Sequence, residues 1–298
     1  MINATIVEKA RKSGKVIPAF NIPYPEMAEP VAHAIIDENS IGMLMVARVE
    51  WENFGAKSLE VIANEYFKHK NDSHTLLHLD HIPAVDENNK ICDFMSIIKR
   101  GIDSGYQSVM IDASRLPLTE NIEATSKVVE LAHNAKICCE AELGKVSGHE
   151  SGPRLPYEVI FKDRVGFTDI DESIIFAKET KCDWLSVAVG SVHGSVADNL
   201  KFEKKPAAML DIEHISNIYN QINLPLVLHG GSGIKLDYIH AAVKAGIAKI
   251  NIGTEIRQTY LKNLEQKNQI AAIDAVYNNV RSILSDDLKI KDLASLLI

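Results

Sequence analysis

Three apolar runs of this sequence are followed by ionisable side chains where turn residues would be expected. The run TLLHLDH reads as a buried strand, yet it closes on Asp80 and His81. His193 follows the run WLSVAVG, and His229 lies within PLVLHGG. One buried histidine is usually structural, but three histidines at the ends of separate strands favour a shared functional site, because random placement would scatter them. Three imidazoles with a fourth position left open are typical of a catalytic zinc site.

The elements that would position these residues alternate along the whole chain. Short apolar runs are separated by helix-period segments such as PEMAEPVAHAIIDEN and LTENIEATSKVVELAHNA. Strands rich in leucine and β-branched residues, separated by helices, are typical of a parallel sheet covered by helices. Eight such units predict an α/β fold, the TIM (β/α)8 barrel, with an open doubly wound sheet as the alternative. The runs lie at 16–22, 42–47, 75–80, 108–114, 136–143, 184–190, 225–231 and 249–253.

The length of 298 residues is compatible with two ordinary domains or with one barrel. We find no Pro/Gly/Ser linker, low-complexity segment or break in the strand–helix alternation. The sequence therefore predicts one barrel domain over residues 1–298, with C-terminal helices from about residue 255 onward.

A barrel would bring the polar residues at the strand ends together. The carboxyl ends of all its strands meet at one mouth, where barrel enzymes have their active sites. We therefore expect a shared site there. Its candidate residues are Asn21, Asp80, His81, Asp112, Glu142, His193, His229 and Asn251.

Composition excludes several classes of protein. The formal charge is −8, without a basic tract, so we expect no nucleic-acid partner. The N-terminal segment MINATIVEKARKSG has no apolar signal region, and no run reaches the roughly 20 apolar residues of a membrane helix. The cysteines form no CxxC pair, which favours reduced thiols and a soluble, cytoplasmic protein without membrane attachment. They are Cys92, Cys138, Cys139 and Cys182.

Six motifs in this chain resemble, in order, the signatures of the class II, metal-dependent ketose-bisphosphate aldolases. They are LHLDH, MIDAS, EAELGKVSGHE, GSVHG, LVLHGGSG and KINIGTE. The resemblance implies an aldehyde-lyase of glycolysis or related carbohydrate metabolism. It also implies that the protein forms a homodimer or homotetramer. Its substrate would be a ketose 1,6-bisphosphate, with fructose 1,6-bisphosphate first and tagatose 1,6-bisphosphate or a related phosphoketose as the alternative. Reversible cleavage to dihydroxyacetone phosphate and glyceraldehyde 3-phosphate would pass through a metal-stabilised enediolate.

The resemblance also implies roles for individual residues. His81, His193 and His229 match the zinc ligands, and Asp80 matches the catalytic aspartate. Zinc on neutral imidazoles acts as a Lewis acid on a ketone oxygen. A carboxylate beside it can take the hydroxyl proton whose removal starts cleavage. Another divalent metal is an alternative, because imidazole also suits cobalt, iron and nickel.

Other acidic residues match the family less specifically. Asp112 and Glu142 match carboxylates near the metal, which tune it, offer another ligand position or are simply structural. Glu150 matches a proton-transfer glutamate in the mobile loop GKVSGHESG, although an exposed loop glutamate is the alternative. His78 is expected in the core or behind the ligands.

Phosphate recognition is expected in the two loops that follow the seventh and eighth strands. Barrels bind phosphate there through backbone N–H groups and a helix N-terminus. The family also places a monovalent cation close by. The candidate residues in these loops are Gly230, Gly231, Ser232, Asn251 and Thr254. The resemblance adds Gly194, with Asn21 and Arg257 as further candidates.

Departures from the family limit the substrate assignment. The segments ARVEWENFGAK and PAVDENNK do not match the family's loops, and Gly253 stands where many fructose-bisphosphate aldolases have aspartate. Two other functions remain as alternatives. A Schiff-base aldolase would need a lysine in the mouth, and Lys249 is expected at the wrong end of its strand. A catalytically silent phosphosugar-binding barrel would lack Asp80 or a ligand, and none is missing.

Overall fold

The computed structural model describes residues 3–146, 155–192 and 208–298 and shows a closed barrel of eight parallel strands. Each strand pairs with its sequence neighbours, and β1 also pairs with β8, which closes the ring. This closure confirms the predicted TIM barrel and excludes the doubly wound sheet. The strands are β1 (Ile17–Asn21), β2 (Gly42–Ala47), β3 (Thr75–Pro83), β4 (Ser108–Asp112), β5 (Cys138–Leu143), β6 (Trp184–Val187), β7 (Leu226–Leu228) and β8 (Ile247–Ile252).

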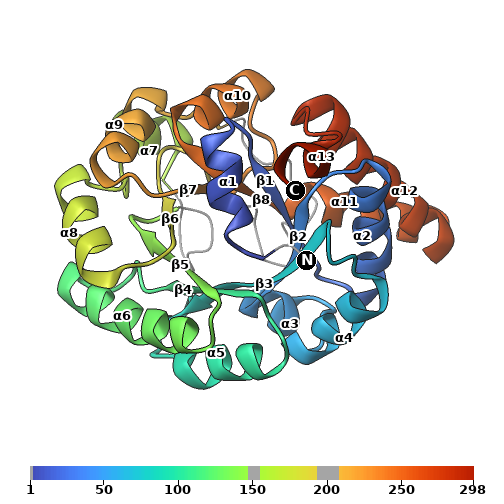
Figure 1. Ribbon diagram of the computed structural model, residues 1–298, viewed down its shortest axis with the longest axis horizontal. Helices are drawn as coiled ribbons and strands as arrows, with labels where there is room; N and C mark the ends of the chain where they lie inside the picture. The colour runs from blue at the N-terminus through green and yellow to red at the C-terminus, as the bar shows by residue number, and fades with distance from the viewer. Residues whose placement is uncertain (1–2, 147–154, 193–207) are drawn as a thin grey trace.

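Helices surround the barrel as an outer layer (Figure 1). Within the described ranges, none is long and apolar enough to cross a membrane. They are α1 (Ile6–Lys12), α2 (Ala28–Asp37), α3 (Arg48–Asn53), α4 (Leu59–His69), α5 (Phe94–Asp103), α6 (Leu118–Asn134), α7 (Tyr157–Lys162), α8 (Ile170–Thr180), α9 (Ile212–Ile222), α10 (Leu236–Ala245), α11 (Thr254–Gln266), α12 (Gln269–Ser282) and α13 (Leu293–Leu297), with the 3-10 helix η1 (Pro25–Met27) and the π-helical turn η3 (Ile283–Asp287).

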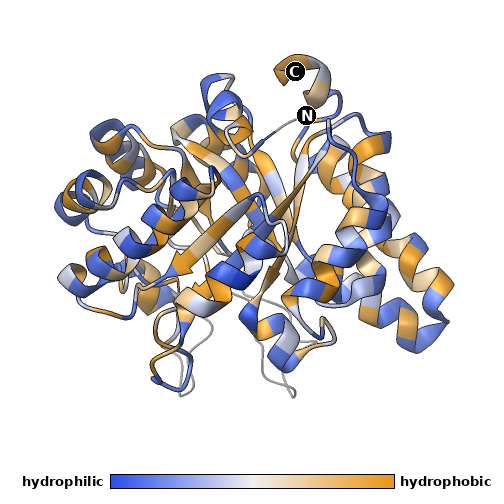
Figure 2. Ribbon diagram, turned by 60° about the horizontal axis from the view of Figure 1, so that its bottom comes forward, coloured by the Kyte–Doolittle hydropathy of each residue, from blue (hydrophilic) through white to orange (hydrophobic). Residues whose placement is uncertain are grey.

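The apolar strands lie between the barrel interior and the helices. Every residue of β2 is buried, as the uninterrupted run GMLMVA predicts for a strand covered on both faces. Figure 2 shows the same division, with hydrophobic residues along the strands and hydrophilic residues on the outer sides of many helices. Burial of these side chains is the main favourable contribution to folding.

Side-chain caps determine where several outer helices begin. In each case a polar side chain before the first helical residue accepts a hydrogen bond from a backbone N–H three residues later. The capping residues are Ser58, Asp93, Asp169, Asp211 and Asn268. These caps satisfy N–H groups that the helix itself leaves unpaired.

The short helix α1 lies across one end of the barrel (Figure 1). It packs against β8 and α13, and the Nζ of Lys9 donates to the backbone carbonyl of Leu297 at 3.2 Å. Because α1 directly precedes β1, it covers the amino-terminal ends of the strands. The polar residues at the strand ends therefore gather at the opposite end.

Candidate metal centre

A bulge in β3 brings two neighbouring side chains to the mouth of the barrel. The parallel register with β4 pairs Leu79 with Val109 but Ile82 with Ile111, so β3 carries one extra residue between them. His81 has a φ of +41° within this bulge. Successive strand residues normally point to opposite faces, and an extra residue redirects one of them. Asp80 and His81 can therefore face the same site.

The ring of His81 meets that of His229, which directly follows β7. The Nε2 of His81 and the Nδ1 of His229 are 2.6 Å apart, and the rings lie edge to face. A carboxylate oxygen of Glu142, on β5, is 4.0 Å from the Nε2 of His81. One donor atom from each residue lies within 4.8 Å of the others. Two imidazoles and a carboxylate are a donor set that fits a divalent transition metal.

Each histidine of this group has a carboxylate at its other ring nitrogen. Asp112 lies 3.3 Å from the Nδ1 of His81, and Glu140 lies 2.8 Å from the Nε2 of His229. Asp112 is itself held by the hydroxyl of Ser114 at 2.6 Å. Such carboxylates fix the orientation of a ligand ring and increase its basicity. Both rings therefore direct their remaining nitrogen toward the centre.

The charges around the centre favour a bound cation. Burial lowers the pKa of His81, but the hydrogen bond to Asp112 and the charges of Asp80 and Glu142 raise it to about 10. Burial, with the nearby Asp112, raises the pKa of Glu142 well above its usual range. Burial keeps His229 neutral by lowering its pKa. Protons on His81 and Glu142 thus compensate for negative charge that a metal ion would also balance.

Two asparagines hold the carboxylate of Asp80. The side-chain amide of Asn21 donates to one oxygen at 3.0 Å, and that of Asn251 donates to the other at 2.9 Å. Asp80 is 2% exposed, so these bonds replace its hydration. The amides come from β1 and β8, on one side of the centre. The side chains of Asn21 and Asn251 therefore orient Asp80. The sequence had indicated only a role in substrate binding for these two residues.

A buried ion pair lies behind the centre. The Nζ of Lys249 is 2.9 Å from Glu140 and 2.6 Å from the side-chain oxygen of Asn251. Both Lys249 and Glu140 are completely buried. His78 is also in this interior, as expected, with its Nδ1 2.8 Å from the hydroxyl of Ser108. Sequence reasoning overlooked Glu140, although the alternation Glu-Ala-Glu in β5 places it on the same strand face as Glu142.

The two loops expected to bind phosphate lie together. The backbone N–H of Gly231 donates to the carbonyl of Asn251 at 3.0 Å, and the N–H of Glu255 donates to the hydroxyl of Ser232 at 3.3 Å. A side chain at Gly231 would meet Ile250 at 2.6 Å, so this close approach requires glycine. Thr254 is the first residue of α11, at the N-terminus of that helix. The phosphate-binding roles of Gly230 and of these residues stay predictions.

Arg257 is buried, at 6% exposure. Its guanidinium carbon lies 4.3 Å from the ring centre of Phe54, in a cation–π contact. Three further candidates, Glu150, His193 and Gly194, lie outside the described residues. Their expected roles therefore stay predictions, including the role of His193 as a ligand.

Glu50, in the segment that departs from the family, is a buried neighbour of this site. Its carboxylate accepts a hydrogen bond from the backbone N–H of Ala47 at 2.8 Å. Burial raises its pKa to about 8, and the charge of Asp80 adds to the shift, whereas hydrogen bonds from Ala47 and Asn21 oppose it. Sequence reasoning marked the segment ARVEWENFGAK as unmatched but could not orient its side chains. Glu50 is therefore largely protonated at neutral pH.

Asp112→Ala should weaken metal binding by about 10–100-fold, because the ring of His81 loses the carboxylate that orients it. Asp112→Asn, which retains an oxygen acceptor, should show a smaller loss. Competition with a chelator of known affinity measures both dissociation constants. Equal affinity in Asp112→Ala and the parent protein would contradict this role for Asp112.

Glu50→Gln should remove a pH dependence of stability. The folded protein keeps a proton on Glu50 that the unfolded chain releases near pH 4.5, so this group lowers the free energy of unfolding as the pH rises from about 4.5 to about 8. Urea denaturation at pH 6 and pH 9 should show a smaller decline for Glu50→Gln than for the parent. Glu130→Gln, on the exposed side of α6, is the matched control. Identical declines in all three proteins would show that Glu50 does not titrate in this range.

Comparisons with known proteins identify the family and the fold of this chain. The family model of class II fructose-bisphosphate aldolase matches residues 3–291. The YdjI aldolase of Escherichia coli K12 is 25% identical over 98% of both chains, with a TM-score of 0.76. Two further structures share the fold. A protein assigned as a fructose-1,6-bisphosphate aldolase from Coccidioides immitis has a TM-score of 0.77 at 24% identity, covering 98% of this chain and 97% of its own. The fructose-bisphosphate aldolase of Campylobacter jejuni has a TM-score of 0.71 at 18% identity, covering 97% and 94%.

The family match extends over nearly the whole chain and includes the strands that supply His81, Glu142 and His229. Class II aldolases depend on a metal, and these three residues form a group that can bind one. The likeness in fold extends over at least 97% of this chain in each of the three structures. The chain belongs to the class II fructose-bisphosphate aldolase family of metal-dependent lyases.

Proposed function

We propose that this protein reversibly cleaves a ketose 1,6-bisphosphate to dihydroxyacetone phosphate and glyceraldehyde 3-phosphate. Fructose 1,6-bisphosphate is the favoured substrate, and tagatose 1,6-bisphosphate or a related phosphoketose is the alternative. The observation that carries the proposal is the group of His81, His229 and Glu142 beside the carboxylate of Asp80. His193 is proposed as the third imidazole ligand.

A zinc ion or another divalent transition metal at this centre would act as a Lewis acid on the carbonyl oxygen of the ketose. The protein's own residues handle the protons. Asp80 is held by Asn21 and Asn251 with both oxygens facing amide donors, so it is oriented to accept the C4 hydroxyl proton. When the C3–C4 bond breaks, C3 of the released fragment needs a proton. Glu150 is proposed to supply it.

The neighbouring loops support a phosphorylated substrate. Ser232 joins the loop after β7 to the N-terminus of α11, where the helix dipole favours an anion. Arg257, three residues into α11, is proposed to contact the distal phosphate. A monovalent cation near these loops is also proposed.

Gly253 bears on the choice between the C4 epimers. A side chain there would approach the Oδ1 of Asn21 to 2.8 Å, and Asn21 orients Asp80. Glycine therefore leaves room for the amide that holds the catalytic carboxylate, while removing an acidic group that could read a substrate hydroxyl. We accordingly expect weak discrimination between the fructose and tagatose bisphosphates.

The contacts of Lys249 argue against the Schiff-base alternative. A lysine nucleophile must be able to reach the substrate, whereas Lys249 is completely buried and its Nζ lies 2.9 Å from Glu140. The presence of Asp80, with its two amide donors, argues against a silent phosphosugar-binding barrel. A metal-dependent reaction remains the better explanation of the site.

Chelation should abolish cleavage of fructose and tagatose 1,6-bisphosphates, and added zinc should restore it. Ranking both bisphosphates and their monophosphates by kcat/KM should show a strong preference for the bisphosphates and a weak one between epimers. Arg257→Ala should reduce the preference for the distal phosphate. Cleavage by fully metal-free protein, or borohydride trapping of substrate on a lysine, would overturn the metal-dependent mechanism.

Asp80→Asn should lower kcat by about 10²–10⁴-fold, because an amide cannot accept the hydroxyl proton. Metal content and thermal stability provide the internal control, since the donor atoms of His81 and His229 are unchanged. Steady-state kinetics on the metal-loaded variant measure the effect. Turnover close to that of the parent would remove Asp80 from the proton transfer.

A further inference from the structure

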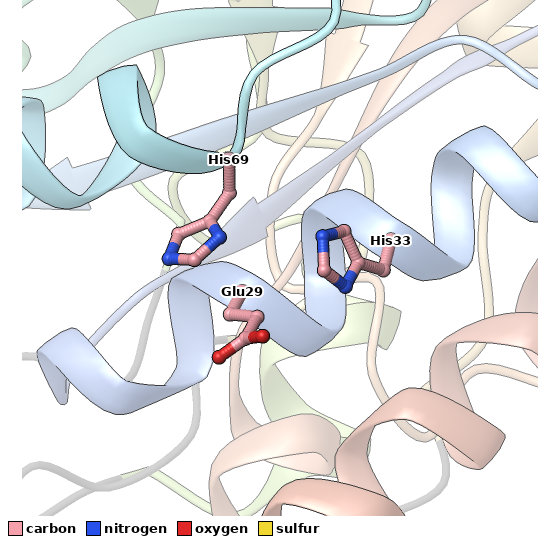
Figure 3. A group of neighbouring side chains, drawn as sticks. All are labelled: Glu29, His33 and His69. Carbon is pink, nitrogen blue, oxygen red and sulfur yellow. The ribbon is translucent and has the colours of Figure 1, made fainter.

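A second group of potential ligands lies on the outside of the barrel. Glu29 and His33 are one helical turn apart on α2, and His69 ends α4 (Figure 3). One donor atom from each lies within 4.8 Å of the others. The helices α2 and α4 pack against each other, so the group spans an interface within the outer layer.

These three side chains have no competing partners in the described ranges. They form no side-chain hydrogen bond or ion pair with the described residues. The rings of His33 and His69 lie edge to face, with their centroids 5.6 Å apart at 85°. Glu29 and His33 are exposed and His69 is half-buried. The group therefore lies at the surface, with its donor atoms already close together.

We propose that Glu29, His33 and His69 form a binding site for a divalent transition metal that links α2 to α4. Two imidazoles and one carboxylate suit zinc, copper, nickel or cobalt, whereas calcium and magnesium prefer oxygen ligands. The spacing of Glu29 and His33 places both side chains on one face of α2. His69 lies at the carboxyl end of α4, where the helix dipole also favours a cation.

The site differs from the metal centre in two respects. It lies on the outer helical layer, and it contains none of the residues assigned to catalysis. Three protein donors leave coordination positions open to water. Binding should weaken at lower pH, because protons compete for the imidazoles. The inference does not rest on the proposed aldolase activity.

Equilibrium dialysis of the zinc-loaded protein against buffered free zinc, followed by elemental analysis, tests the site. The parent should take up two equivalents per chain. His33→Ala, His69→Ala and Glu29→Gln should each lose or weaken only the second equivalent. His133→Ala, which removes an exposed histidine from α6, is the matched control and should keep both.

Thermal unfolding provides an independent measurement. Zinc above one equivalent should raise the Tm of the parent and of His133→Ala, because ligand binding to the folded state stabilises it. It should leave the Tm of His33→Ala and His69→Ala unchanged. Retention of the first equivalent in every variant would show that the barrel is intact. Zinc uptake that is the same in the parent, His33→Ala and His69→Ala would overturn the proposal, as would loss of the second equivalent in His133→Ala.

Discussion

The balance of buried charge at the carboxyl ends of the barrel strands governs the arrangement of the site. Asp80, Asp112, Glu140 and Glu142 converge there on a small volume. Charges removed from water must be paired or coordinated. Glu140 is paired with Lys249, and Asp80 receives two amide donors. The remaining acidic groups, Asp112 and Glu142, lie beside His81, where bound protons or a metal ion would balance their charge.

This distribution of charge links elements that are far apart in the sequence. A continuous path of polar contacts runs from His229 through Glu140 and Lys249 to Asn251 and then to Asp80. His229, a candidate metal ligand, and Asp80, the proposed base, are thus supported by the same residues. A change at one member is expected to affect the others non-additively, as in other buried polar networks.

The sequence was sufficient to predict the barrel and the convergence of its strand ends, because alternating apolar runs and helices have few stable packings. It could not reveal the bulge in β3, which depends on how β3 pairs with β4. It also gave no sign that Lys249, expected near the start of its strand, contacts Glu140 inside the barrel. The role of Glu50 as a buried neighbour of the site could not be predicted from the sequence for a similar reason. Its raised pKa depends on burial in the folded chain and on the tertiary positions of Asn21, Asp80 and Arg257.

At position 81 the left-handed backbone favours glycine for stability, whereas the proposed metal site needs the imidazole of histidine. A β-carbon in that region is unfavourable by roughly 1–3 kcal/mol, and glycine would relieve the strain. A sequence selected for stability alone would therefore drift away from histidine here. Only selection for the ring nitrogen would retain it. Computational redesign for thermostability would favour the same replacement, so position 81 would have to be held fixed.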